Sequence, residues 1–289
     1  MKPAPFDYVA PASIGEAIEA LAEAGGGAAV IAGGQTLMPL LALRMSQPFI
    51  LVDVNRTAGM TGITHGPVGT RIGAMTRQAA LLVDAELTRR QPTLVKAAEH
   101  IGHYQTRNRG TIGGSIALGE PAAELPATAV ALGAEIEVHS VRGERRIKAD
   151  EFYLGSYMTT LEPDELVTAI HFPVVASSAV TVFHELARRP GDFALVGLVG
   201  SLDIAAGKIA RAGLAWFGMG PTPIRARQAE AALAGQAIDA CDAAAIAALA
   251  IADTEPFDDH HATADYRRKV GAKLFAQTLV RALDQRLAV

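Results

Sequence analysis

The sequence predicts an α+β protein built of two domains. The chain has 289 residues, which is enough for two hydrophobic cores. Strand-like and helix-like segments alternate in its first part, whereas residues 180–217 hold three strand-like runs that three helix-like segments follow. Small, unpatterned residues at 174–179 separate the two parts. We therefore expect a first domain over residues 1–175 and a second over residues 176–289.

The first elements have strong local signals. Ser13 and Glu16 form a capping box, and apolar residues at helical spacing follow as far as the glycines at 25–27. Residues 28–32 then read as a strand that leads directly into the glycine pair at 33–34. The expected order at the start of the chain is therefore strand, helix, strand and glycine loop.

The remaining elements follow from the same two periodicities. Expected strands of the first domain lie at residues 49–54, 69–73, 135–140 and 164–173, and expected helices at 37–43, 76–84, 92–100 and 122–132. Expected strands of the second domain lie at residues 180–186, 194–204 and 209–217, and expected helices at 225–233, 240–252 and 264–287. A turn at residues 207–208 makes the last two strands an antiparallel hairpin.

The composition excludes several classes of function. Half of the residues are hydrophobic and 19% are charged, so either the surface is rich in alanine or part of it is buried against other chains; we favour the second. The longest apolar run, residues 243–252, is too short for the ~20 residues of a membrane helix. Because residues 1–5 lack a signal-peptide core, we expect a cytoplasmic protein. A net charge of −4 without a basic tract argues against nucleic acid.

The single cysteine, Cys241, limits the metal and redox chemistry of the chain. One thiol cannot hold an iron–sulfur cluster, build a cysteine-based zinc site or close an internal disulfide. The acidic and histidine residues at 258–261 could gather a metal, but such a run is more often a solvated loop. We therefore expect no metal site in this chain.

Two glycine pairs carry the strongest functional signal. Gly33-Gly34 and Gly113-Gly114 each follow an apolar, strand-like run and are followed directly by an amide or hydroxyl residue. Such bends can turn successive backbone N–H groups toward one point and so bind an anion, although a single glycine pair usually only makes a turn. Two of them together predict a ligand with two phosphates, and we expect a flavin dinucleotide. The G-x-G-x-x-G fingerprint of a Rossmann site is absent.

Four ordered motifs add a family resemblance. Residues 32–39, 107–115, 121–126 and 188–194 resemble the signatures of the FAD-binding medium subunit of molybdenum hydroxylases, the family of xanthine dehydrogenase and aerobic carbon monoxide dehydrogenase. Their order and spacing match over essentially the whole chain. The resemblance implies a two-subdomain FAD domain of the vanillyl-alcohol-oxidase (PCMH) type. A smaller α+β domain of the carbon monoxide dehydrogenase flavoprotein type, with an antiparallel sheet and helices, would follow it.

The resemblance also implies a role in electron transfer. A large subunit with a molybdopterin cofactor would oxidise the substrate, and a small subunit would carry [2Fe–2S] clusters. This chain would pass the electrons through FAD to an external acceptor, in a dimer of heterotrimers. The lone cysteine fits this division of labour, and it excludes the variant of this subunit that carries a [4Fe–4S] cluster.

The implied FAD contacts are spread along the chain. Residues 32–37 and 111–115 would surround the diphosphate, with glycine N–H groups and the hydroxyls of Thr36, Thr111 and Ser115 as donors. Glu124 would bond the ribityl chain, and Phe193 would lie against the flavin ring. Three further residues would line the isoalloxazine or adenine end. The full set is Ala32, Gly33, Gly34, Gln35, Thr36, Leu37, Ile101, Thr111, Ile112, Gly113, Gly114, Ser115, Glu124, Val167, His184 and Phe193.

Two departures from the family pattern are visible. Residues 118–120 stand where relatives often have a histidine and an aspartate, and His184 or Glu185 stands where many have a lysine. They leave the electron acceptor open among NAD, quinone and oxygen, and the substrate open as well. The alternative functions are an autonomous FAD-dependent oxidase or dehydrogenase with its own substrate site, and a non-catalytic assembly subunit. The short chain without a substrate cap argues against the first, and the intact glycine loops argue against the second.

Overall fold

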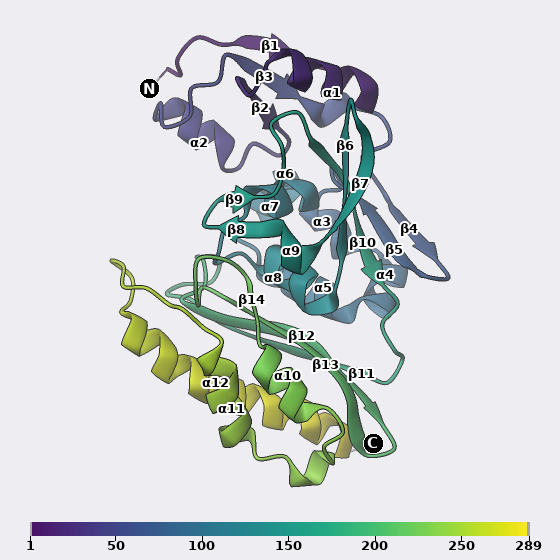
Figure 1. Cartoon of the computed structure of the whole chain (residues 1–289), viewed down its shortest axis with the longest axis vertical. Coiled ribbons are helices and arrows are strands. Elements are labelled where there is room, and N and C mark those ends of the chain that lie inside the picture. Colours follow the sequence, from purple (N-terminus) through teal and green to yellow (C-terminus); the bar gives the residue numbers. More distant parts are fainter. Residues whose placement is uncertain (1, 288–289) are drawn as a thin grey trace.

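The chain folds into three parts that follow one another from top to bottom in Figure 1. The computed structural model describes residues 2–287. The N-terminal subdomain, residues 2–56, contains β1 (Asp7–Val9), α1 (Ile14–Glu23), β2 (Ala28–Ile31), α2 (Leu37–Ala42), β3 (Ile50–Asp53) and the short 3-10 helix η1 (Val54–Arg56). Its three strands form a parallel sheet in the order β1-β3-β2. The predicted cap at Ser13 is confirmed, because its hydroxyl accepts the N–H of Glu16 at 3.2 Å; the Glu16 carboxylate accepts the N–H of Ala12 at 2.7 Å, one residue before the cap.

The middle subdomain, residues 57–175, is built on a five-stranded antiparallel sheet. Its order is β4 (Ile63–Gly66), β5 (Gly69–Gly73), β10 (Leu166–Pro173), β6 (Glu135–Ser140) and β7 (Gly143–Lys148). The helices between β5 and β6 are α3 (Gln78–Leu81), α4 (Ala85–Arg90), α5 (Pro92–His100), α6 (Tyr104–Arg109), α7 (Ile112–Leu118) and α8 (Glu124–Leu132). A short helix, α9 (Ala149–Phe152), and a small hairpin, β8 (Tyr153–Gly155) with β9 (Met158–Thr159), complete it.

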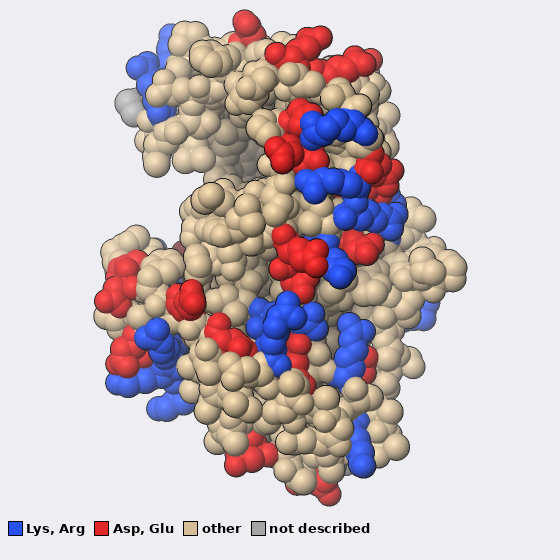
Figure 2. Space-filling model, viewed as in Figure 1, with Lys and Arg blue, Asp and Glu red and all other residues tan. Residues whose placement is uncertain are grey.

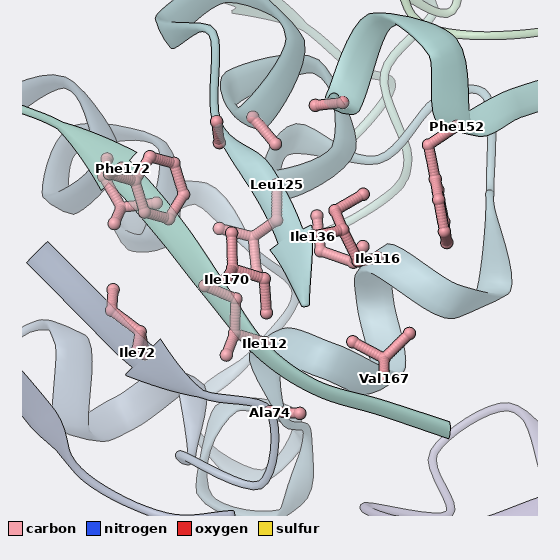
Figure 3. Packing of buried hydrophobic residues seen from close by; sticks show 14 of the residues in the cluster. Ile72, Ala74, Ile112, Ile116, Leu125, Ile136, Phe152, Val167, Ile170 and Phe172 are labelled. Atoms are coloured by element: carbon pink, nitrogen blue, oxygen red, sulfur yellow. The ribbon is translucent and has the colours of Figure 1, made fainter. Parts of the chain in front are cut away.

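The core of this subdomain joins the sheet to α7 and α8. Figure 3 shows Ile112 and Ile116 of α7 and Leu125 of α8 packed against Ile136 and Ile170 of the sheet. Every residue of α8 is buried, because one side faces this core and another lies on strands of the C-terminal part. Helix α8 therefore runs through the middle of the molecule, with its N-terminus at the cavity described below.

The C-terminal part, residues 176–287, is an antiparallel sheet covered by helices. The sheet has the order β11 (Ala179–Leu186), β12 (Val196–Ala205), β13 (Lys208–Phe217) and β14 (Ile224–Arg225). One face packs on α5 and α8, and the other on α10 (Arg227–Leu233), α11 (Ala243–Ala252) and α12 (Ala264–Leu287). A second 3-10 helix, η2 (Ile238–Ala240), joins α10 to α11. Trp216 is fully buried between sheet and helices and donates its indole N–H to the Ala250 carbonyl at 3.0 Å.

These elements confirm the predicted α+β class, and one local prediction is wrong. The second glycine pair does not follow a strand: α6 ends at Arg109, and Gly113 and Gly114 lie in the first turn of α7. The reason is that Thr111 caps α7, with its hydroxyl accepting the N–H of Gly114 at 3.1 Å. Within residues 2–287 no helix is long and apolar enough to cross a membrane, and no group of three metal-ligating side chains comes together.

Candidate cofactor site

A cavity of about 580 Å³ lies between the N-terminal subdomain and the middle subdomain. Figure 2 shows it as the hollow on the left of the molecule, below the top lobe. The loop at residues 32–37 and the start of α7 both border it. The first residues of α8 and β10 and the turn at residues 191–193 also contribute to its lining. The cavity thus draws on all three parts of the fold.

The first glycine loop presents a row of free backbone donors to this cavity. After β2 ends, Gly34 adopts a φ of +71°, a conformation that L side chains rarely adopt, and the chain turns into α2. Within the described residues, none of the five N–H groups from Gly33 to Leu37 has a hydrogen-bond partner. The hydroxyl of Thr36 makes no capping bond either. Consecutive unpaired N–H groups at a helix start are the donor set that phosphate oxygens require.

The second glycine loop is built differently. The N–H groups of Ile112 and Gly113 donate to the carbonyls of Thr76 and Ala74 at 3.1 and 2.8 Å. Helix α7 itself occupies the next two, because the Gly114 and Ser115 N–H groups donate to the side chain and carbonyl of its cap, Thr111. These four amides therefore hold the loop in place, and phosphate binding by this loop stays a prediction.

The second loop offers a free hydroxyl group to the cavity, and its glycine lets α7 pack closely on the end of β5. Ser115 lines the cavity, and its hydroxyl has no hydrogen-bond partner in the described part of the chain. A Cβ on Gly113 would lie 2.4 Å from the Cβ of Ala74, well inside van der Waals contact. Gly113 is therefore required by the packing of α7 onto the end of β5. Its absent side chain lets the start of α7 reach the cavity.

Two carboxyl groups lie at the start of α8. Glu124 is the first residue of that helix, is 6% exposed and lines the cavity. Burial, followed by the charge of nearby Glu185, raises the pKa of Glu124 to about 8. Burial also raises the pKa of Glu185 to about 7, and its Oε2 atom is buried without a partner among the described residues. Glu124 is consequently mostly protonated at neutral pH and can both donate and accept a hydrogen bond.

A second carboxylate in the lining is kept ionised. Glu165, just before β10, receives two hydrogen bonds of 2.7 Å from the Arg145 guanidinium. Burial alone would raise the pKa of Glu165, but the Arg145 bonds outweigh it and lower the pKa below its usual value. The cavity therefore places a neutral carboxyl and a charged carboxylate on its wall, each fixed by its surroundings.

The cavity gathers most of the residues predicted from the sequence. Ile101, Val167 and Phe193 all line it, as do the predicted loop residues apart from Ile112. Ile112 points into the core beneath α7 (Figure 3). His184 also lies outside the lining. It lies on the same face of β11 as Val182, the face that packs on the C-terminal helices, and burial lowers its pKa. Contact of each residue with a ligand stays a prediction.

Several lining residues carried no signal in the sequence. Met60, Met75 and Gln78 reach the cavity only through tertiary packing, and no local motif marks them. Gln78 is notable because its Oε1 atom is buried without a hydrogen-bond partner among the described residues. Asp192 does fall within a quoted motif, residues 188–194, but its place beside the cavity follows from the turn at Gly191, where φ is +87°.

The donor set and the lining fit an FAD molecule. The free N–H groups of the first loop suit a diphosphate, and apolar residues such as Ile101 and Val167 suit an aromatic ring. Residues 4–175 match the sequence family described as the FAD binding domain in molybdopterin dehydrogenase, and residues 181–282 match the CO dehydrogenase flavoprotein C-terminal domain. The chain therefore belongs to the FAD-binding medium subunits of the molybdenum hydroxylase family, as its motifs predicted.

Similarity to individual relatives extends over nearly the whole chain. The 6-hydroxypseudooxynicotine dehydrogenase complex subunit alpha of Paenarthrobacter nicotinovorans is 39% identical over 99% of this chain and 97% of its own. The carbon monoxide dehydrogenase medium chain of Hydrogenophaga pseudoflava is 36% identical over 96% of this chain and 97% of its own. A solved structure of carbon monoxide dehydrogenase from that organism superposes with a TM-score of 0.94 at 38% identity, covering 100% and 99% of the two chains.

Proposed function

We propose that this chain is the FAD-carrying electron-transfer subunit of a multi-subunit molybdenum hydroxylase. The observation that carries the proposal is the row of unpaired N–H groups at Gly33–Leu37 bordering the cavity of a family FAD domain. Bound FAD can accept electrons one at a time from iron–sulfur clusters and release them in pairs to an external acceptor. The clusters and the molybdopterin cofactor would belong to partner subunits, since one cysteine cannot hold a cluster.

In this proposal each group of residues has a distinct task. The N–H groups of residues 33–37 and the hydroxyls of Thr36 and Ser115 bind the diphosphate. Glu124, protonated at neutral pH, bonds a polar group between the diphosphate and the ring, where an ionised carboxylate would cost free energy through burial. Ile101 and Val167 keep water from the apolar end. Phe193, 60% exposed on its turn, covers the open edge of the flavin ring.

The partners follow from the family. We propose that a large molybdopterin subunit and a small [2Fe–2S] subunit join this chain, as a dimer of heterotrimers, with a division of this chain near residue 175. The relatives' names, which include a 6-hydroxypseudooxynicotine dehydrogenase and a carbon monoxide dehydrogenase, cover unlike substrates. This variety supports the assignment of substrate choice to the large subunit. Exposed apolar side chains, such as Leu154, Tyr157 and Met158 on the β8–β9 hairpin, offer surface for such contacts.

The visible absorption spectrum tests the proposal. The chain purified alone should show flavin bands, and iron–sulfur absorption should appear only when it is co-purified with the subunits encoded beside it. A colourless protein in both preparations would overturn the FAD assignment. Flavin reduction by a small organic substrate in the isolated chain would instead favour the autonomous oxidase or dehydrogenase.

A further inference from the structure

Asn55 and Arg77 connect the two glycine loops from outside the cavity. Asn55 lies in η1, directly after β3, and its Nδ2 atom donates to the Ala32 carbonyl at 2.8 Å. Arg77 directly precedes α3; its Nη2 atom donates to Oδ1 of Asn55 at 2.7 Å, and its Nη1 atom donates to the Arg109 carbonyl. A continuous chain of hydrogen bonds thus runs from the carbonyl before Gly33 to the carbonyl before Gly110. Neither Asn55 nor Arg77 lines the cavity.

The donor and acceptor atoms of this chain admit one arrangement. A guanidinium only donates, so the Asn55 atom that faces Arg77 is the amide oxygen. The amide nitrogen is then left for two acceptors, the Ala32 carbonyl at 2.8 Å and Oδ1 of Asp53 at 2.6 Å. Asp53 is itself held, because the Tyr8 hydroxyl donates to its Oδ2 at 2.6 Å. The Asn55 side chain is therefore fixed at both ends.

This arrangement determines the direction of a donor in the cavity. In a planar trans peptide the carbonyl and the following N–H point in opposite directions. The bond from Asn55 holds the Ala32 carbonyl on the outer side of the loop, so the N–H of Gly33 points away from Asn55. Gly33 lines the cavity and its N–H has no partner among the described residues. The hydrogen bond from Asn55 to the Ala32 carbonyl therefore determines that the Gly33 N–H points into the cavity.

We propose that Asn55 and Arg77 are positioning residues for FAD: they hold the two glycine loops at the separation and orientation that the diphosphate needs. This inference rests on the proposed function and adds to it two residues that do not touch the ligand. Arg77 acts here through its fork of two donors, not through its charge. A lysine at the same position would keep the charge but could not reach both the Asn55 oxygen and the Arg109 carbonyl in the same geometry.

The test uses the full-length chain and FAD itself. We expect Asn55→Ala and Arg77→Lys each to release FAD at least about tenfold faster than wild type, measured by the return of flavin fluorescence on dilution. Because the bonds lie near the surface, the melting temperatures of the apoproteins should stay within about 3 °C of wild type. Arg89→Lys is the matched control: Arg89 pairs with Glu86 on the exposed face of α4, and the variant should release FAD as wild type does.

A double variant separates positioning from simpler roles. If the two residues act in one chain, Asn55→Ala combined with Arg77→Lys should release FAD little faster than the more severe single variant. Fully additive effects, or wild-type release by Arg77→Lys when Arg77→Gln is impaired, would overturn the proposal; the second outcome would assign Arg77 a charge role. Faster release accompanied by an equal fall in apoprotein stability would overturn it too. If wild type binds no FAD, the proposed function falls and this inference falls with it.

Discussion

Gly33 lies directly against the backbone of Arg109, so the two glycine loops touch without any side chain between them. A Cβ placed on Gly33 would be 2.3 Å from the Arg109 carbonyl oxygen and 2.8 Å from Cα of Gly110. Both are backbone atoms of the opposite loop, which a rotamer change cannot move aside. The requirement for glycine at this position is therefore a requirement for contact between the two subdomains that face the cavity.

Gly33→Val should abolish FAD retention without unfolding the C-terminal part. The added side chain separates the loops and misplaces the free donors of residues 33–37. Gly15→Ala is the control, since a Cβ at this position in α1 meets only the Ser13 hydroxyl at 3.8 Å. The flavin-to-protein absorbance ratio should fall below about a tenth of wild type in Gly33→Val, an effect expected from loss of several charge-assisted bonds. A yellow Gly33→Val variant with full flavin content would contradict the assignment of this loop.

Gly191→Ala should expose the flavin to solvent. Gly191 has a φ of +87°, and a Cβ there would lie 3.0 Å from the Gly102 carbonyl oxygen as well as 2.5 Å from the exposed His103 ring, so we expect the strained turn that carries Phe193 to shift. Gly207→Ala is a matched control, because Gly207 has a φ of +71° but open space around it. Both changes strain the backbone, and only the first moves the turn beside the cavity. Collisional quenching of flavin fluorescence by iodide should rise in Gly191→Ala and not in Gly207→Ala. Equal quenching in the two variants would contradict the proposal that Phe193 covers the flavin ring.

Replacement of Glu124 should change how stability depends on pH. The folded pKa of Glu124 is raised to about 8, above the unfolded value of 4.5, so folding retains a proton that the unfolded chain releases. The contribution of Glu124 to stability is complete below pH 4.5 and declines as pH rises from there to about 8. Glu124→Gln cannot ionise, so its apoprotein should lose less stability than wild type between pH 5 and 8. Urea denaturation measures this, with exposed Glu19→Gln as control; parallel curves for wild type and Glu124→Gln would contradict the buried, protonated carboxyl.

Glu137 should protect the middle subdomain against acid. It receives bonds from Arg71 at 2.7 Å and Thr168 at 2.9 Å and lies 2.7 Å from His171. Burial opposes ionisation, but these bonds prevail and lower the pKa of Glu137 to about 2. Its stabilisation is therefore present above pH 4.5 and is lost as pH falls toward 2.

The matching variant is Glu137→Gln, which leaves the Arg71 charge unpaired on the sheet. We expect it to lower the free energy of unfolding by about 2–4 kcal/mol at pH 7, with the difference from wild type shrinking as pH falls toward 2. Glu135→Gln, on the same strand with a looser and more exposed pair to Arg146 at 3.6 Å, should cost less than about 1 kcal/mol. Equal costs in the two variants would show that the bonds to Glu137 contribute no more than a surface pair.

The fold was predictable where the local signal coincided with the tertiary environment. The cap at Ser13 begins a helix with one buried side, which sequence periodicity reports directly, and β12 and β13 were recognised as apolar runs that a turn joins, since both faces of their sheet are covered. Helix α6 was missed because its six residues, Tyr104–Arg109, are polar and none is buried. Without it, the second glycine pair looked like the end of a strand.

The residues of the site were likewise predictable only where a single segment carries the signal. The first loop carries its unpaired N–H groups in its own backbone conformation, so its motif alone was enough to place residues 33–37 at the cavity. The roles of Asn55 and Glu165 depend on the distant partners Ala32 and Arg145, and no sequence spacing reveals them. His184 shows how strongly a prediction for a strand depends on the exact residue. Its neighbour Glu185 lies on the opposite face of β11, near Glu124, so an error of one residue places the predicted side chain on the wrong face of the sheet.

Helix α8 has a consequence for how this chain can vary. All nine of its residues are buried, from Glu124 at the cavity to Leu132 beside the C-terminal sheet. A Cβ on Gly213 of β13 would lie 2.3 Å from the Ala131 carbonyl, so sheet and helix are in backbone contact there. An ordinary amphipathic helix has an outer face on which substitutions are neutral, and α8 has none. Its sequence should therefore drift very little among functional variants, while the surface of the surrounding helices diversifies freely.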